Sequence, residues 1–389
     1  MNLRIFTVFY VVCLMVFAQT SIARPNDITC PAGHTINKVF SSGAEWSLCW
    51  EEKANEGIVL SNILYSTPGN NPRKVLGEAS LSQIQTDFDD GSTQQFSVTS
   101  VGLGGDSLVD LSSQDCPQGR LVENNGKSVL CETTKPMGYI WKYRTQHKQG
   151  DLLELFSLSK INSISYVIKW KFYENGIIEP AVGVSGKLTK IGSNLNHGWL
   201  VTENDLIAVG FTNHYFWRLD FDIDVDGNND LLEQISSIPS SNKLKKSKVI
   251  ASINTESALS LNPVNKVFWR VRDNSEQNST VGHISYELNL LNYAHQGKGN
   301  NSEPWLNNDF FVTRYNPCER FAVKNPTQDG CAENISQFVN GQNINAKDIV
   351  TWYRASYHHL PRDEDINQIA TRWTSLKLIP RDWSPSNPL

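Results

Sequence analysis

The sequence predicts an all-β protein, a large antiparallel β-sandwich. Apolar and polar residues alternate between Ser163 and Phe172, which is typical of a strand with one buried face. The residues 174–176, Glu-Asn-Gly, tolerate positive φ and let the chain reverse as a hairpin. Helical periodicity is scarce, whereas tryptophan is frequent, with 11 in 389 residues. We expect the buried face of this strand to consist of Ile164, Tyr166, Ile168, Trp170 and Phe172.

Composition limits the classes of partner. With 39% hydrophobic and 19% charged residues, the chain can bury one large core or two modest ones. A formal net charge of -5 and a pI near 5.9 give no reason to expect nucleic acid or an anionic membrane as a partner.

The first 23 residues have the pattern of a secretory signal peptide. Arg4 is the positive end, Ile5–Ala18 is the apolar stretch, and the small residues before Arg24 form a cleavage site. An uncleaved anchor is disfavoured because the apolar run is short for a membrane span. We expect a secreted or periplasmic protein with no membrane attachment in the mature form.

Six cysteines follow the signal segment, an even number in a chain expected to be exported. Cys116 with Cys131, and Cys318 with Cys331, would close short loops. That leaves Cys30 and Cys49 as the third pair. No Cys/His spacing indicates zinc.

Taken in order, residues 24–43 are polar and are expected to form an N-terminal arm. Apolar runs separated by turns then predict strands along most of the chain, and the segment after His358 is proline-rich with no further clear strand. The predicted strands lie within Gly57–Tyr65, Lys74–Leu81, Gln94–Leu111, Leu121–Thr133, Trp199–Gly210, His214–Asp224, Lys248–Ile253, Lys266–Asp273, His283–Leu291, Phe310–Arg314 and Asp348–His358.

The hairpin segment also carries a specific motif. Ser157-Leu158-Ser159, Tyr166, Trp170-Lys171-Phe172 and Asn175-Gly176 fall without a gap onto the pattern around the quinone cofactor of copper-containing amine oxidases, which the chain resembles over residues 44–389. The resemblance implies the family's catalytic β-sandwich without its small N-terminal domains. It also implies a homodimer, and a primary amine as the substrate of an active member.

In that family a tyrosine of the chain is oxidised to the quinone, topaquinone, and the resemblance places Ile164 at this position. A hydrocarbon side chain cannot yield a quinone. Tyr166 lies on the same face, but two residues along a strand is about 7 Å, too far to substitute. We therefore expect no quinone here and assign Tyr166 to packing.

The resemblance places the family's general base at Asp89, in the segment Phe88-Asp89-Asp90-Gly91. The family's base removes the α-proton of the amine while the quinone accepts electrons. An ordinary turn is the alternative interpretation of this segment.

Copper is held in the family by a His-x-His on one strand and a third histidine further on. His359, before Leu360-Pro361-Arg362, matches the third ligand, whereas Thr212 and His214 stand where His-x-His should be. The spacing from His214 to Arg218 is also one residue short, and a one-residue slip turns a side chain to the other face of a sheet. Two imidazoles and a hydroxyl make a poor copper site. Alternatively, both histidines are hydrogen-bonded residues of the interior.

Asp220, Asp222 and Asp348 match positions at which the family binds a structural calcium, with the carbonyls of Phe221 and Ile349 completing the set. The run Asp222–Gly227, followed by Glu233, also satisfies the EF-hand loop pattern. A true EF-hand needs a helix on each side, and we expect a strand before it. A solvated acidic turn is the third alternative.

Two functions remain open. The one that we favour is an exported amine oxidase-like protein, impaired or inactive as an oxidase and retained as a binding or structural module. The alternative is an active copper-dependent enzyme that converts primary amines to aldehyde, ammonia and hydrogen peroxide. A hydrolase working through Asp89 has no supporting motif.

Overall fold

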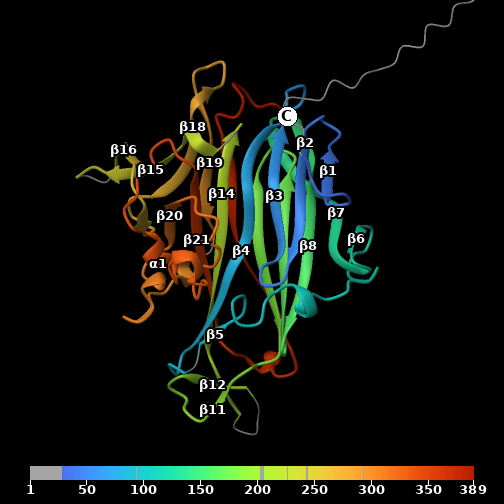
Figure 1. The fold of residues 1–389 in the computed structure, drawn as a ribbon, viewed down its shortest axis with the longest axis vertical. Coiled ribbons are helices and arrows are strands. Elements are labelled where there is room, and N and C mark those ends of the chain that lie inside the picture. The colour runs from blue at the N-terminus through green and yellow to red at the C-terminus, as the bar shows by residue number, and fades with distance from the viewer. Residues whose placement is uncertain (1–28, 93, 202–205, 226, 242–243, 292) are drawn as a thin grey trace, which may run out of the picture.

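A computed structural model describes residues 29–389 apart from 93, 202–205, 226, 242–243 and 292 (Figure 1). The predicted signal peptide lies outside the described residues. In the described part, the protein is built almost wholly of antiparallel strands, as predicted. None of the helices described there is long and apolar enough to cross a membrane.

Two large sheets form the molecule. The first has the strand order β1-β2-β3-β4-β14-β21-β20-β17, and β5 pairs with β4. Its strands are β1 (Thr35–Val39), β2 (Glu45–Lys53), β3 (Gly57–Ser66), β4 (Arg73–Phe88), β14 (Phe211–Asp224), β21 (Ile349–His359), β20 (Phe310–Arg314), β17 (Ser257–Leu259) and β5 (Gln95–Phe96). The expected N-terminal arm therefore contains a strand, because β1 pairs with β2.

The second sheet has the order β16-β15-β18-β19-β22-β10-β9-β8-β7-β6. Its strands are β16 (Lys246–Ile253), β15 (Asp230–Pro239), β18 (Phe268–Gln277), β19 (His283–Leu290), β22 (Ile369–Arg381), β10 (Ile178–Gly186), β9 (Ile164–Tyr173), β8 (Gln146–Ile161), β7 (Lys127–Tyr143) and β6 (Arg120–Asn124). Strand β22 lies in the segment that we expected to lack a clear strand, so that expectation was wrong.

Small elements complete the chain. A three-stranded sheet of β11 (Ile191–Gly192), β13 (Ile207–Val209) and β12 (Gly198–Leu200) projects from one end of the molecule (Figure 1). The one short α-helix among the described residues is α1 (Ile335–Phe338). The short 3-10 turns are η1 (Gly105–Ser107), η2 (Gly227–Asn229), η3 (Tyr293–His295), η4 (Pro304–Leu306), η5 (Gln328–Gly330) and η6 (Asp363–Asp365).

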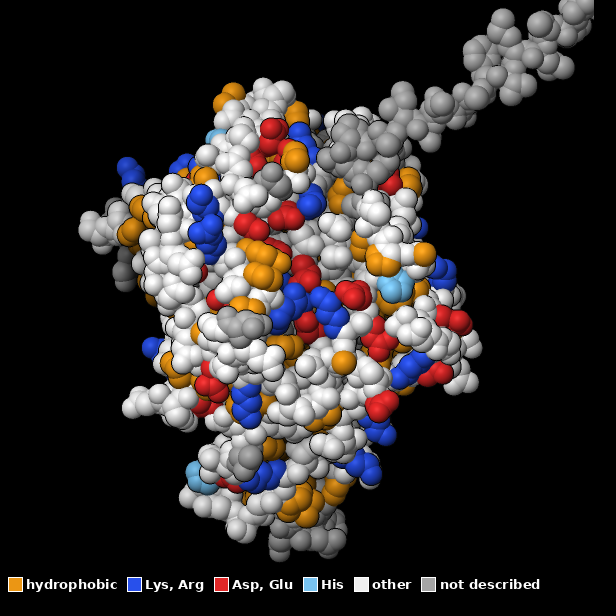
Figure 2. Space-filling model, in the orientation of Figure 1, with side chains coloured by type: hydrophobic (Ala, Val, Ile, Leu, Met, Phe, Trp, Pro, Cys, Tyr) orange, Lys and Arg blue, Asp and Glu red, His pale blue; other side chains and the backbone are white. Residues whose placement is uncertain are grey.

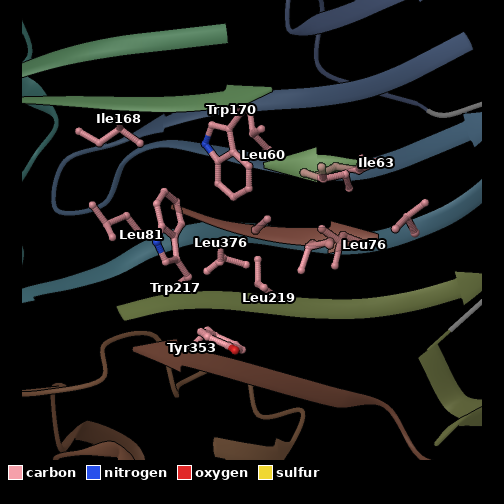
Figure 3. Close-up of a cluster of buried hydrophobic side chains, with 14 of the residues drawn as sticks. Leu60, Ile63, Leu76, Leu81, Ile168, Trp170, Trp217, Leu219, Tyr353 and Leu376 are labelled. Carbon is pink, nitrogen blue, oxygen red and sulfur yellow. The ribbon is translucent and has the colours of Figure 1, made fainter. Parts of the chain in front are cut away.

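The main core lies between the two sheets. Strand β9 buries alternate residues, as the sequence predicts, and the Glu174–Gly176 turn joins it to β10. Trp170 of β9 meets Trp217 of β14 edge to face, with 5.1 Å between ring centroids (Figure 3). A second apolar cluster packs on the outer face of the first sheet and includes Phe216, Trp352 and Phe338 of α1. Residues of β14 therefore alternate between two buried environments.

The surface shown in Figure 2 carries acidic and basic side chains intermixed, without one large area of a single sign. This agrees with the modest net charge of the chain. Charge on this face therefore gives no support to a nucleic-acid partner.

Candidate functional site

Ile164 begins β9 and faces the other sheet. Its side chain is 6% exposed and belongs to the main core, and it lines a groove with a volume of about 720 Å³. Phe88 at the end of β4 and Phe96 of β5 line the same groove. The position that the resemblance assigns to the quinone is thus an apolar wall between the sheets.

Tyr166 is a core residue, 2% exposed, whose hydroxyl lies 3.4 Å from Ser97 Oγ. Burial raises the pKa of the phenol above its ordinary value. Its ring lies in the same apolar cluster as Ile164 and Trp170. These contacts agree with the packing role that the sequence indicates.

The two histidines predicted to share copper face opposite sides of the first sheet. Strands β14 and β21 pair one to one from Phe211–His359 to Phe221–Ile349, with His214 opposite Ser356. Side chains alternate along each strand, so His359 shares a face with Phe211 and Asn213, while His214 projects the other way. The copper site predicted at His214 and His359 therefore has its two imidazoles on opposite faces of this sheet, and it stays a prediction that the register does not support. No bulge in β14 absorbs the missing residue before Arg218.

His214 is bound into a polar network on the outer face. Its Nδ1 lies 2.7 Å from Ser356 Oγ and 3.3 Å from Arg354 Nη1, and its Nε2 lies 3.3 Å from Asp87 Oδ2. Burial is the largest influence on the ring and lowers its pKa, which favours neutral imidazole. Both ring nitrogens face protein partners, so His214 fits the alternative of a hydrogen-bonded structural residue.

His359 is equally enclosed. It is 3% exposed, packs 5.0 Å from the Phe211 ring between centroids, and places Nε2 3.0 Å from Asp365 Oδ2. Burial lowers its pKa. Phe211 and Asn213, which share its face, offer at most one weak amide ligand to a metal. These residues do not fit a copper centre.

Asp89 does not line the groove beside Ile164. Its two carboxylate oxygens lie 3.0 and 3.1 Å from Nε2 of His358, and its backbone N–H donates to the carbonyl of Gly210. His358 faces outward beside Thr212, whereas Phe88 faces the groove. Asp89 thus forms a partly exposed pair with His358 on the side of the sheet away from Ile164. Its role as a general base stays a prediction.

Three carboxylates do come together as predicted. One oxygen from each of Asp220, Asp222 and Asp348 lies within 4.8 Å of the others. Asp220 is 7% exposed, and burial raises its pKa to about 8, with the neighbouring carboxylates adding to the effect and Arg218 opposing it. Its buried Oδ1 has no hydrogen-bond partner among the described residues.

The backbone at Gly227 lies close against these oxygens. A methyl group on Gly227 would lie 2.4 Å from Asp222 Oδ1, 3.0 Å from Asp348 Oδ1 and 3.0 Å from the Phe221 carbonyl. Those oxygens therefore converge on one point, as calcium ligands do. The flanking elements are strands β14 and β15, so the EF-hand alternative is wrong. Asp226 of that pattern lies outside the described residues.

The three disulfides join the cysteines that the sequence pairs. They link Cys116 to Cys131, Cys318 to Cys331 and Cys30 to Cys49.

Sequence reasoning missed the polar partners of the histidines and two lysines of the groove. Lys190 and Lys324 line it from segments far apart in the chain. Nothing in the local sequence marks either lysine. The His358-His359 doublet was visible, but only the register showed which of its two rings lies on the same face as Phe211.

This two-sheet antiparallel sandwich is the fold of copper amine oxidases of known structure. The sequence profile of the copper amine oxidase enzyme domain matches residues 38–389, and the chain belongs to this family.

Its relatives are distant. It is 23% identical to the primary amine oxidase of Pisum sativum over 92% of this chain and 60% of that protein. It is 23% identical to that of Arthrobacter sp. over 95% of this chain and 63% of that protein. The chain thus spans about three-fifths of these relatives' length.

Solved structures share the fold. The copper-containing benzylamine oxidase of Hansenula polymorpha superposes with a TM-score of 0.75 at 15% identity, over 98% of this chain and 64% of that one. The Pichia pastoris lysyl oxidase also gives 0.75 at 15% identity, over 88% of this chain and 52% of that one.

Proposed function

We propose that this chain keeps the amine oxidase sandwich as a binding module and does not oxidise amines through a quinone. Ile164 carries the proposal, because its position is the quinone-tyrosine position by resemblance and its side chain has no phenol. The separation of His214 from His359 by the sheet, and the pairing of Asp89 with His358 instead of a place in the lining of the groove, support it. Export through the predicted signal peptide, and a homodimer, belong to the same proposal.

The purified chain is expected to release no hydrogen peroxide above the blank from a panel of primary amines. It should also give no quinone redox stain and bind copper far below one equivalent, because the donors do not converge. Peroxide release, quinone staining and elemental analysis measure these properties. An active copper amine oxidase assayed alongside serves as the positive control.

Amine-dependent peroxide together with a positive stain would refute the proposal. The variant Ile164→Tyr, incubated with copper, tests the missing phenol separately from the missing copper donors. We expect it to remain unstained, because restoring the phenol leaves the metal donors unchanged. Staining of this variant would show that a copper site survives.

We further propose that calcium binds at Asp220, Asp222 and Asp348, with the Phe221 carbonyl as a ligand. Carboxylate and carbonyl oxygens suit this cation, and a buried carboxylate without a partner gains most from it. A bound cation would tie β14 to the residue before β21 and would stabilise the sandwich.

A further inference from the structure

The groove beside Ile164 has a polarity unlike that expected of a site for cationic amines. The described residues that line it include two lysines, Lys190 and Lys324, and no carboxylate. Its walls are the rings of Phe88 and Phe96. The other lining groups are neutral, and hydroxyl and amide side chains are contributed by Gln94, Gln95, Ser100, Asn162, Ser163 and Thr189.

The two cations differ in how far they are already neutralised. Lys190 Nζ lies 3.0 Å from Asp90 Oδ2 and 5.3 Å from the centroid of the Phe88 ring. Lys324 Nζ lies 4.2 Å from the centroid of the Phe96 ring, and no ion pair joins it to a carboxylate in the described part of the chain. Within the described residues, the groove therefore has one positive charge without a carboxylate partner, beside an aromatic wall.

The backbone presents Lys324 rigidly. Its φ of 55° is in the left-handed region, which non-glycine residues adopt only when the surroundings hold them. Next to it, buried Asn325 accepts hydrogen bonds from the backbone N–H groups of Arg320 and Phe321. It also donates to the carbonyl of Ala332.

Two further links fix this loop. The Cys318–Cys331 disulfide closes it, and Gln83 of β4 donates to the carbonyl of Val323 at 2.9 Å. A lysine on a loop fixed in this way loses little backbone entropy when a ligand binds, which favours affinity.

We propose that the groove binds a small molecule with an apolar or aromatic body and one anionic group, a carboxylate or a phosphate. Lys324 contacts the anion, the hydroxyl and amide groups supply hydrogen bonds, and the body packs on Ile164 and the phenylalanine rings. A protonated amine is repelled by the same lysine. The inference rests on the proposed function, because a quinone at residue 164 would replace the apolar wall.

Matched probes test the proposal. Phenyl phosphate, benzoate, benzyl alcohol and benzylamine share a ring and differ in charge, and calorimetric titration of the purified chain measures their binding. The two anions should bind more tightly than the alcohol, with benzylamine weakest. Added sodium chloride should weaken only the anions.

Substitutions of lysine test whether the anions bind in the groove. Lys324→Gln should weaken benzoate and phenyl phosphate about fivefold or more, as expected for loss of a charge-assisted contact. Lys324→Glu should reverse the order and favour benzylamine. Lys187→Gln is the control, because Lys187 is an exposed lysine close to Lys190 in sequence that does not line the groove.

Three results would overturn the inference. They are absence of anion binding, benzylamine binding as tightly as benzoate, and equal loss of affinity in Lys324→Gln and Lys187→Gln. The proposed function fails by a different observation, the release of peroxide from benzylamine. Absence of both peroxide and anion binding would refute the groove inference alone.

Discussion

Replacing Glu78 with glutamine is expected to lower the free energy of unfolding by about 3–5 kcal/mol, the usual cost of leaving a buried charge without its partner. Glu78 Oε1 lies 2.8 Å from Nη1 of Arg218, which is fully buried in β14, and 2.7 Å from Nη1 of Arg320. Burial alone would raise the pKa of Glu78, but Arg218, Arg320 and Lys53 outweigh it and hold the pKa below its ordinary value. Equilibrium unfolding in guanidinium chloride measures the change.

Glu132→Gln is the matched control. The side chain of Glu132 is 18% exposed against 19% for Glu78, but its partner Arg120 is 60% exposed. An ion pair with one exposed partner contributes about 0–1 kcal/mol. An equal loss of unfolding free energy in Glu78→Gln and Glu132→Gln would show that the burial of Arg218 does not make its ion pair more stabilising.

The sequence predicted those features that depend on neighbouring residues. The alternation from Ile164 to Phe172 determines which side chains of β9 are buried, and the short cysteine loops suggest their own disulfides. Strand β22 had a comparable signal, since Leu376 and Leu378 are fully buried two residues apart. The prolines that follow in the terminal segment are typical of a loop and oppose that signal.

Features that depend on register could not be predicted in the same way. The face on which His214 lies is set by its pairing with β21, some 140 residues later in the chain. The irregularity in this part of the sheet lies in β4, where Ser82 has no register partner between Leu81 and Gln83, not in β14 where the histidine spacing is short. The sequence shows that the spacing in β14 is one residue short. It does not show which of the paired strands carries the bulge.

The groove illustrates a second limit. Lys190 follows β10 and Lys324 lies in a disulfide-closed loop, and the ends of the two sheets bring them together. Neither lysine belongs to a local motif. Only the folded chain reveals that they line the groove beside Ile164.

Calcium is expected to raise the melting temperature of the purified chain by about 3 °C at a concentration near a hundred times its Kd, since such binding contributes about 2.7 kcal/mol. The gain follows from Asp220, whose buried carboxylate faces Asp222 and Asp348. Scanning calorimetry with calcium, magnesium or EDTA measures it. Magnesium should have little effect, because it demands a smaller, stricter geometry.

Asp220→Asn separates calcium binding from general stability. Without calcium this variant should melt at or above the temperature of the unchanged protein, because burial, aided by the neighbouring carboxylates, already disfavours a charge at this position. With calcium it should show no upward shift. The exposed carboxylate Asp106 is the control, and Asp106→Asn should keep the full response. A calcium shift that persists in Asp220→Asn would place the ion elsewhere, whereas a lower melting temperature without calcium would mean that Asp220 stabilises the fold through contacts of its own.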